Sequence, residues 1–293
     1  MERLRDFFSF YLPPDSKLNS TPKLHFFELF FQAEDGIRDR SPSRGLGDVY
    51  KRQDNLKSRR DQLKSVELST ELQFEFRSTK AAPKNYISQS DMVLADIGIL
   101  EAGLNAKKEG FSAVCIDTMS DSGVDALRSC LDIPVIGPGQ TSMLCAMMMG
   151  NKFSIITMWK SWFHLYDKNI KNLGIKDKVA SIRSINVKPD NQSLLAGKEE
   201  EIFPLLLKAA QSAVENDGAD VIILGSTTMH QSHAYLTKNL NVPVINPGPL
   251  TYKMAETMID AGLAHSKNAY PGSPVPKYDL FGAMMDAARK ADR

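Results

Sequence analysis

The amino-acid sequence predicts an α/β protein in which helices cover parallel sheets. Short apolar runs typical of buried strands alternate with segments of ten or more residues that favour helices. A stretch of about 30 residues also occurs twice. The chain has 293 residues, 42% of them hydrophobic, which is enough for one large domain or two modest ones.

The expected strands are short and apolar, as in sheets buried on both faces. The first is different, because Leu72, Phe74 and Phe76 alternate with polar residues. In chain order, we expect strands at 66–76, 113–116, 134–136, 153–157, 179–185, 221–224 and 244–245.

Helices are expected between these strands. Gly174 follows one of them and is a residue on which helices commonly end, whereas Pro204 is tolerated only near a first turn. In chain order, we expect helices at 55–64, 91–108, 123–130, 142–149, 159–172, 199–216, 229–240 and 250–261.

The repeated stretch covers Gly110–Gly139 and Gly218–Gly248. Each copy runs through a buried strand into small hydroxyl residues, then through a helix into PVIGPG or PVINPG. We therefore expect two Rossmann-like parallel-sheet domains related by pseudo-twofold symmetry, with the site in the cleft between them. The first domain would comprise 55–149 plus 248–293, and the second 150–247.

Thr118 and Ser226 occupy equivalent positions in the two copies, each eight residues after the first glycine. Each would lie at the C-terminal end of a buried strand, where open α/β sheets bind ligands. Both residue types are also favoured helix N-caps. Capping and ligand binding are compatible, because a helix N-terminus also attracts anions.

Residues 32–53 lack an amphipathic period and are dense in Arg, Asp, Ser and Gly, as in a disordered linker. The stretch from about 26 to 53 resembles a translated sequencing-library adapter. We therefore expect residues 1–54 to be non-native or disordered, and the first domain to lack its first strand. The alternative is a genuine mobile N-terminal arm.

Composition excludes several classes of protein. The chain has 36 Lys and Arg against 35 Asp and Glu. Because there is no basic excess, the charge does not indicate a nucleic-acid partner. We find no apolar run long enough for a membrane span and no signal-peptide pattern. Cys115, Cys130 and Cys145 lack metal-ligand spacing and indicate reduced thiols in a cytoplasmic protein.

Two motifs and their order resemble those of a known family. SAVCIDTMSDSGVDALRS resembles the first motif of hydantoin and allantoin racemases, and GADVIILGSTTM resembles the second. IPVIGPG and VPVINPG match the passages between the domains. The chain is thus identified as similar to the aspartate/glutamate/hydantoin racemase superfamily over about Asp91 to Ala261.

The resemblance implies catalysis without a cofactor by two cysteines. One thiolate removes a proton beside a carboxylate or carbonyl, and the other thiol delivers one to the opposite face. The matching positions are Thr118 and Ser226, and neither is cysteine. A thiol ionises at a pKa of about 8.5, whereas an aliphatic hydroxyl needs an adjacent base. The two-thiol mechanism therefore does not transfer directly.

Nearby residues suggest other catalytic groups. His230 follows Ser226 by four positions and is the candidate base, with His233 a weaker one. Asp121 follows Thr118 at capping-box spacing. Cys115 is expected in the core, with a catalytic role as the alternative. A metal site of Asp117, His230 and His233 has the right residue types but no recognised spacing. The candidate residues are Thr118, Ser226 and His230 for catalysis, and Asp117, Ser120, Thr227, Thr157 and Thr79 for substrate binding.

The leading functional hypothesis is a cofactor-independent racemase or isomerase acting on a small amino acid, hydantoin or carboxylate. One alternative is a lyase, decarboxylase or hydrolase that uses Ser226 with His230. Another is a catalytically silent ligand-binding or accessory protein. We expect a small-molecule carboxylate or cyclic amide as ligand, a homo-oligomer, and neither a nucleic-acid nor a membrane partner. The loop 262–274 is expected on the surface, with a lid over the site as the alternative.

Overall fold

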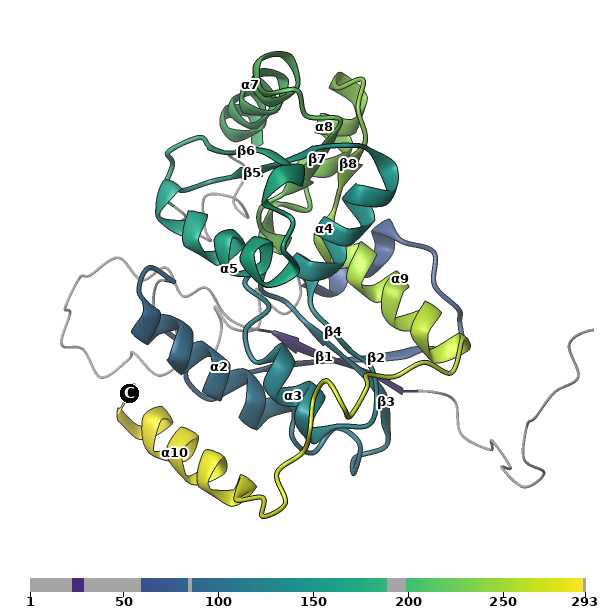
Figure 1. The fold of residues 1–293 in the computed structure, drawn as a ribbon, viewed down its shortest axis with the longest axis vertical. Helices are drawn as coiled ribbons and strands as arrows, with labels where there is room; N and C mark the ends of the chain where they lie inside the picture. Colours follow the sequence, from purple (N-terminus) through teal and green to yellow (C-terminus); the bar gives the residue numbers. More distant parts are fainter. Residues whose placement is uncertain (1–22, 29–58, 84–85, 189–198, 292–293) are drawn as a thin grey trace, which may run out of the picture.

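The computed structural model describes residues 23–28, 59–83, 86–188 and 199–291. It contains two four-stranded parallel sheets (Figure 1). The first sheet has the order β2-β1-β3-β4, formed by β1 (Lys23–Glu28), β2 (Gln73–Ser78), β3 (Phe111–Ile116) and β4 (Val135–Ile136). The second has the order β6-β5-β7-β8, formed by β5 (Phe153–Thr157), β6 (Val179–Ser184), β7 (Val221–Leu224) and β8 (Val244–Ile245). The two orders match, and the expected α/β class with parallel sheets is confirmed.

The helices follow the expected alternation. They are α2 (Gln89–Gly103), α3 (Val124–Cys130), α4 (Pro138–Met149), α5 (Phe163–Leu173), α7 (Glu199–Asp217), α8 (Ser232–Asn239), α9 (Pro247–Asp260) and α10 (Tyr278–Ala291). Short 3-10 turns are η1 (Gln62–Ser65), η2 (Lys160–Trp162), η3 (Lys176–Lys178) and η4 (Thr227–Met229).

Four helix ends have clear chemical causes. Ser88 and Asp91 form a reciprocal capping box at the start of α2. α4 and α9 begin at prolines, about one turn before the expected starts, because proline fits the first helical position. α5 ends at Gly174 in the left-handed conformation, as expected.

The expectation that the first sheet lacks a strand is wrong. β1 lies between β2 and β3 and pairs in parallel with both (Figure 1). Its sequence, KLHFFE, is rich in aromatic residues that favour strands, and it includes Phe26 and Phe27 from the adapter-like segment. The rest of that segment, 29–53, lies outside the described residues.

Strand membership supports the proposed division into two domains, whose boundaries stay a prediction. β1 to β4 precede residue 150, whereas β5 to β8 lie within 150–247. α9 returns to the first half of the chain, where it packs on β3 and α4, and α10 packs on α2. α10 was not expected from the sequence.

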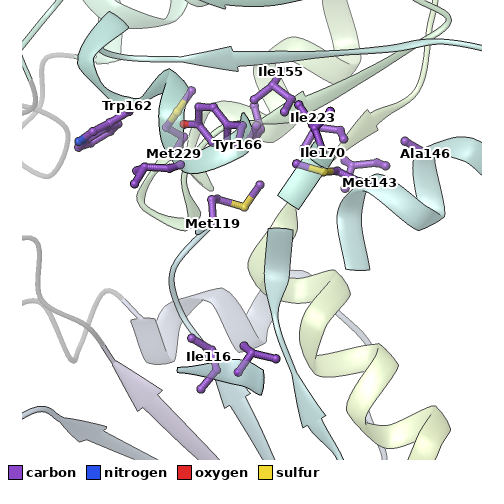
Figure 2. Packing of buried hydrophobic residues seen from close by; sticks show 14 of the residues in the cluster. Ile116, Met119, Met143, Ala146, Ile155, Trp162, Tyr166, Ile170, Ile223 and Met229 are labelled. Atoms are coloured by element: carbon purple, nitrogen blue, oxygen red, sulfur yellow. The ribbon is translucent and has the colours of Figure 1, made fainter. Parts of the chain in front are cut away.

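The main hydrophobic core is continuous between the two sheets. Met119, on the loop after β3, lies close to Tyr166, Met229 and Ile170 of the second half, while Ile116 lies further toward the first sheet (Figure 2). A separate small cluster on the first sheet contains Cys115 together with residues of α9. β3 therefore packs against α9, whereas the loop after it packs against the second half of the chain.

Within the described part of the chain, no helix has the length and apolar character needed to cross a membrane.

Candidate active site

The two copies of the repeat meet at the ends of β3 and β7. Thr227 Oγ1 donates a 3.3 Å hydrogen bond to the main-chain carbonyl oxygen of Asp117. Asp117 directly follows β3, and Thr227 begins η4, two residues after Gly225. The structure thus brings together two predicted site residues that lie 110 positions apart.

Thr118 and Ser226 play similar local roles after their strands. Thr118 Oγ1 accepts hydrogen bonds from Ser120 Oγ at 3.2 Å and the Ser122 main-chain N–H at 3.3 Å. Ser226 Oγ accepts one from the Thr228 main-chain N–H at 3.2 Å and lies 2.7 Å from Thr228 Oγ1. Both hydroxyls organise the turn that follows. Ser226 is the N-cap residue of η4, as the capping interpretation expected. For Thr118 that interpretation is wrong, because the N-cap residue of α3 is Gly123. Both residues are buried.

Asp117 forms a buried ion pair with Arg59, whose Nε lies 2.7 Å from Asp117 Oδ2. Burial raises the pKa of the Asp117 carboxyl, and the charge of Arg59 partly offsets this rise. Sequence reasoning missed Arg59 as a site residue. No local motif marks it, because its partner is distant in the sequence.

His230 lies at the end of η4, where the charges of Arg59 and Asp61 act on its ring. Burial, followed by the nearby charge of Arg59, lowers its pKa to about 4. The ring is therefore neutral at neutral pH, and its Nδ1 has no hydrogen-bond partner in the described structure. His233 is placed differently, because its Nε2 lies 3.0 Å from the carbonyl oxygen of Val244 and supports β8.

Asp121 links three elements rather than acting in a capping box with Thr118. Its carboxylate accepts hydrogen bonds from the main-chain N–H groups of Gly139 at 2.8 Å and Gln140 at 2.6 Å, and from Asn169 Nδ2 at 3.1 Å. It thereby caps α4 and contacts α5. Its φ of 50° lies in the left-handed region. Burial raises its pKa to about 7, against the opposing effect of the two main-chain donors.

The remaining predicted binding residues have different surroundings. Thr157 is fully buried and its Oγ1 lies 2.7 Å from Tyr166 Oη, which is also 2.6 Å from the carbonyl oxygen of Gly225. Thr157 therefore supports the second motif indirectly, through Tyr166. Ser120 is buried and lies 2.9 Å from Ser122 Oγ. Thr79 is buried near α2, and its hydroxyl has no partner in the described part of the chain.

The cysteines are unpaired, and Cys115 lies in the core. Its Sγ lies 3.9 Å from the carbonyl oxygen of Thr251, and burial raises the pKa of the thiol well above its usual range. Cys130 and Cys145 are half-buried. Among the described residues, no cluster of three or more His, Cys, Asp or Glu could hold a metal ion.

The loop 262–274 is anchored to α3 and β4. His265 Nε2 accepts a 2.8 Å hydrogen bond from the Val135 main-chain N–H. Lys267 Nζ donates to the carbonyl oxygens of Arg128 at 2.8 Å and Leu131 at 2.5 Å, which end α3. These contacts favour the surface-loop interpretation over a lid.

Comparisons with known proteins show relatives in both sequence and fold. The hydantoin racemase of Pseudomonas sp. (strain NS671) is 31% identical over 192 residues, which cover 65% of this chain and 75% of the relative. The hydantoin racemase of Rhizobium meliloti is 30% identical over 194 residues, covering 64% and 78%. The solved allantoin racemase of Klebsiella pneumoniae superposes with a TM-score of 0.70 at 21% identity, covering 87% of this chain and 95% of that one.

The model of the Asp/Glu/Hydantoin racemase family matches residues 57–255. This range is most of the chain and includes both copies of the repeat. The expected enzyme class, isomerase, follows from this family and its hydantoin racemase relatives. The chain belongs to the Asp/Glu/hydantoin racemase family.

Proposed function

We propose that this protein exchanges the proton on the carbon beside a carbonyl or carboxylate of a small hydantoin, amino acid or carboxylate, without a cofactor. The observation that carries the proposal is the junction of the two motifs through Thr227 and Asp117. This junction sets the Thr118 and Ser226 turns at the ends of strands from both sheets. The hydantoin racemases among the relatives support a hydantoin as the first substrate to test.

In this proposal, His230 is the group that takes the proton. It is neutral at neutral pH, and Nδ1 has no partner in the described structure. A neutral imidazole can accept a proton from carbon, which neither hydroxyl can do without its own base. A positioned general base contributes roughly 10²–10⁴-fold to a rate.

Hydroxyl and N–H donors would stabilise the negative charge that develops on the substrate oxygen. Thr118, Ser226 and Thr227 are the donors in this proposal, together with the main-chain N–H groups of the two turns. The Asp117 carboxylate pairs with Arg59 at 2.7 Å. Its main-chain carbonyl oxygen accepts the hydrogen bond from the Thr227 hydroxyl, and the two contacts fix the end of β3. Removal of one such oxyanion donor typically lowers a rate by about 10²–10³.

The test is deuterium incorporation at the substrate α-carbon in deuterated water, followed by proton NMR. The wild type should exchange a 5-substituted hydantoin, and His230→Asn, Thr118→Ala and Ser226→Ala should each lose about 10²-fold in rate or more. Thr257→Ala serves as the matched control, because Thr257 is exposed on α9. Unchanged exchange in both Thr118→Ala and Ser226→Ala would refute the site.

The same assay distinguishes the other hypotheses. Ring opening or loss of carbon dioxide, without exchange, would support the hydrolase or lyase alternative. Binding without turnover would support the accessory protein. We also propose a cytoplasmic location, which the three unpaired cysteines support. A homo-oligomer stays a prediction, testable by light scattering.

A further inference from the structure

The N-terminal ends of α4 and α9 occupy equivalent positions in the repeat, but their main-chain N–H groups are capped differently. Asp121 caps α4 with its carboxylate. At α9, the N-cap residue Asn246 makes no capping hydrogen bond with its side chain. The first turn of α9 therefore keeps N–H groups that no side-chain acceptor is shown to cap.

Gln62 is the side chain that lies against this turn. A Cβ atom added to Gly248, in the first turn of α9, would lie 2.0 Å from Gln62 Oε1. Only glycine leaves room for the amide at this position. Gln62 is 0% exposed, yet neither its Oε1 nor its Nε2 has a hydrogen-bond partner in the described structure.

Asn246 adds a second unsatisfied amide at the same helix end. It is 7% exposed, and its Oδ1 also lacks a partner among the described residues. A buried polar atom without a partner costs free energy, so native proteins seldom keep one without a reason. Three such atoms on two side chains at one helix end point to a ligand that satisfies them.

The segment that carries Gln62 also reaches the proposed catalytic groups. Arg59, three residues earlier, pairs with Asp117 at the end of β3. Arg59 and Asp61 both act electrostatically on His230 of η4. Through Arg59, the segment that carries Gln62 thus contacts the junction of the two motifs.

We propose that Gln62, Asn246 and the first turn of α9 form a specificity subsite for a ligand with an N–H group next to a carbonyl, as in a cyclic amide. The inference rests on the proposed function and adds the residues that select the substrate. Gln62 Oε1 and Asn246 Oδ1 accept from ligand N–H groups. Gln62 Nε2 and the α9 main-chain N–H groups donate to its carbonyl oxygen. A carboxylate alone would leave both acceptor oxygens unmatched.

The experiment compares hydantoin with 1,3-dimethylhydantoin, which keeps the ring and carbonyls but has no N–H group. Isothermal titration calorimetry measures both affinities for the wild type, Gln62→Met and Asn246→Ala. The wild type should bind hydantoin at least about tenfold more tightly than the dimethyl compound, and each variant should lose most of this preference. Gln211→Met is the control, because Gln211 is exposed on α7.

A stability measurement separates ligand recognition from a structural role. Methionine resembles glutamine in shape and has no amide, so Gln62→Met removes two buried atoms that lack partners. The melting temperature of the free protein should therefore stay equal or rise while the hydantoin preference falls. Asn246→Ala should leave the melting temperature nearly unchanged, because Asn246 makes no capping bond.

Two results would overturn the subsite. One is a hydantoin preference that persists in both variants, and the other is a lower melting temperature in Gln62→Met. If the wild type exchanges amino acids but does not bind hydantoin, the subsite alone fails. If it neither binds hydantoin nor exchanges any tested substrate, the proposed function fails with it.

Discussion

The hydroxyl of Thr227 donates a hydrogen bond to the main-chain carbonyl oxygen of Asp117 and so joins the ends of strands from two different sheets. The bond is buried, with Thr227 1% exposed. It connects the two halves of an internal repeat at corresponding places, directly after β3 and just after β7. The proposed chemistry depends on this hydrogen bond remaining formed.

Replacing Thr227 with valine tests the junction. Valine keeps the shape of threonine but cannot donate, so the free energy of unfolding should fall by about 0.5–1.5 kcal/mol. Exchange activity should fall as well, because the two turns lose their direct bond. Urea unfolding measures the first effect and deuterium incorporation the second. Thr257→Val is the control, since its hydroxyl bonds only within α9 at an exposed position. Equal losses in both variants would contradict the special role of the junction.

Asp121 should make stability depend on pH. Its folded pKa is about 7 against an ordinary value of 3.8, so the unfolded chain releases its proton at lower pH than the folded protein does. Between about pH 4 and pH 7, the free energy of unfolding should therefore fall as the pH rises, by a few kcal/mol at most. His230, with its lowered pKa, acts in the opposite direction below about pH 6.5.

The Asp121 effect is isolated by comparing the wild type with Asp121→Asn in urea unfolding at several pH values. The variant cannot titrate at this position, so its free energy of unfolding should fall less steeply with rising pH. Asp260→Asn, at an exposed position on α9, should keep the wild-type slope. Parallel curves for the wild type and Asp121→Asn would show that Asp121 does not titrate in this range.

Cys115 should behave as a core residue despite lying three positions before Thr118. Burial raises the pKa of its thiol, and little thiolate is present at neutral pH. In the folded protein, iodoacetamide should modify the half-buried Cys130 and Cys145 well before Cys115, as measured by mass spectrometry. Cys115→Ala should retain deuterium exchange at the wild-type rate per folded molecule. Fast modification of Cys115, or loss of exchange in Cys115→Ala, would assign the thiol a catalytic part.

Much of the fold could be predicted because local patterns determine it. The buried strands β3, β5 and β7 are apolar runs, and Gly174 ends α5 as its residue type suggests. α4 and α9 begin earlier than the sequence analysis predicts, because a proline occupies the first helical position of each. β1 was missed because its neighbours in the sequence resembled foreign sequence.

The site was less predictable because its key contacts join distant parts of the chain. The repeat indicated that Thr118 and Ser226 are equivalent, and this remains the basis of the proposed site. It gave no sign of Arg59 or Gln62, because Asp117, which pairs with Arg59, and Gly248, which lies next to Gln62, are far along the sequence. Thr157 lies at a strand end, as expected of a binding residue, but its hydroxyl faces Tyr166.

The most direct test of the central claim restores thiols at both strand ends. If Thr118 and Ser226 face one substrate, the double variant Thr118→Cys/Ser226→Cys should racemise a 5-substituted hydantoin, because a thiol provides the thiolate that a hydroxyl cannot. Deuterium incorporation should exceed that of the wild type at least about tenfold, and each single variant should fall well short of the double one. A folded double variant that exchanges no faster than the wild type would contradict the claim that these two positions form one site.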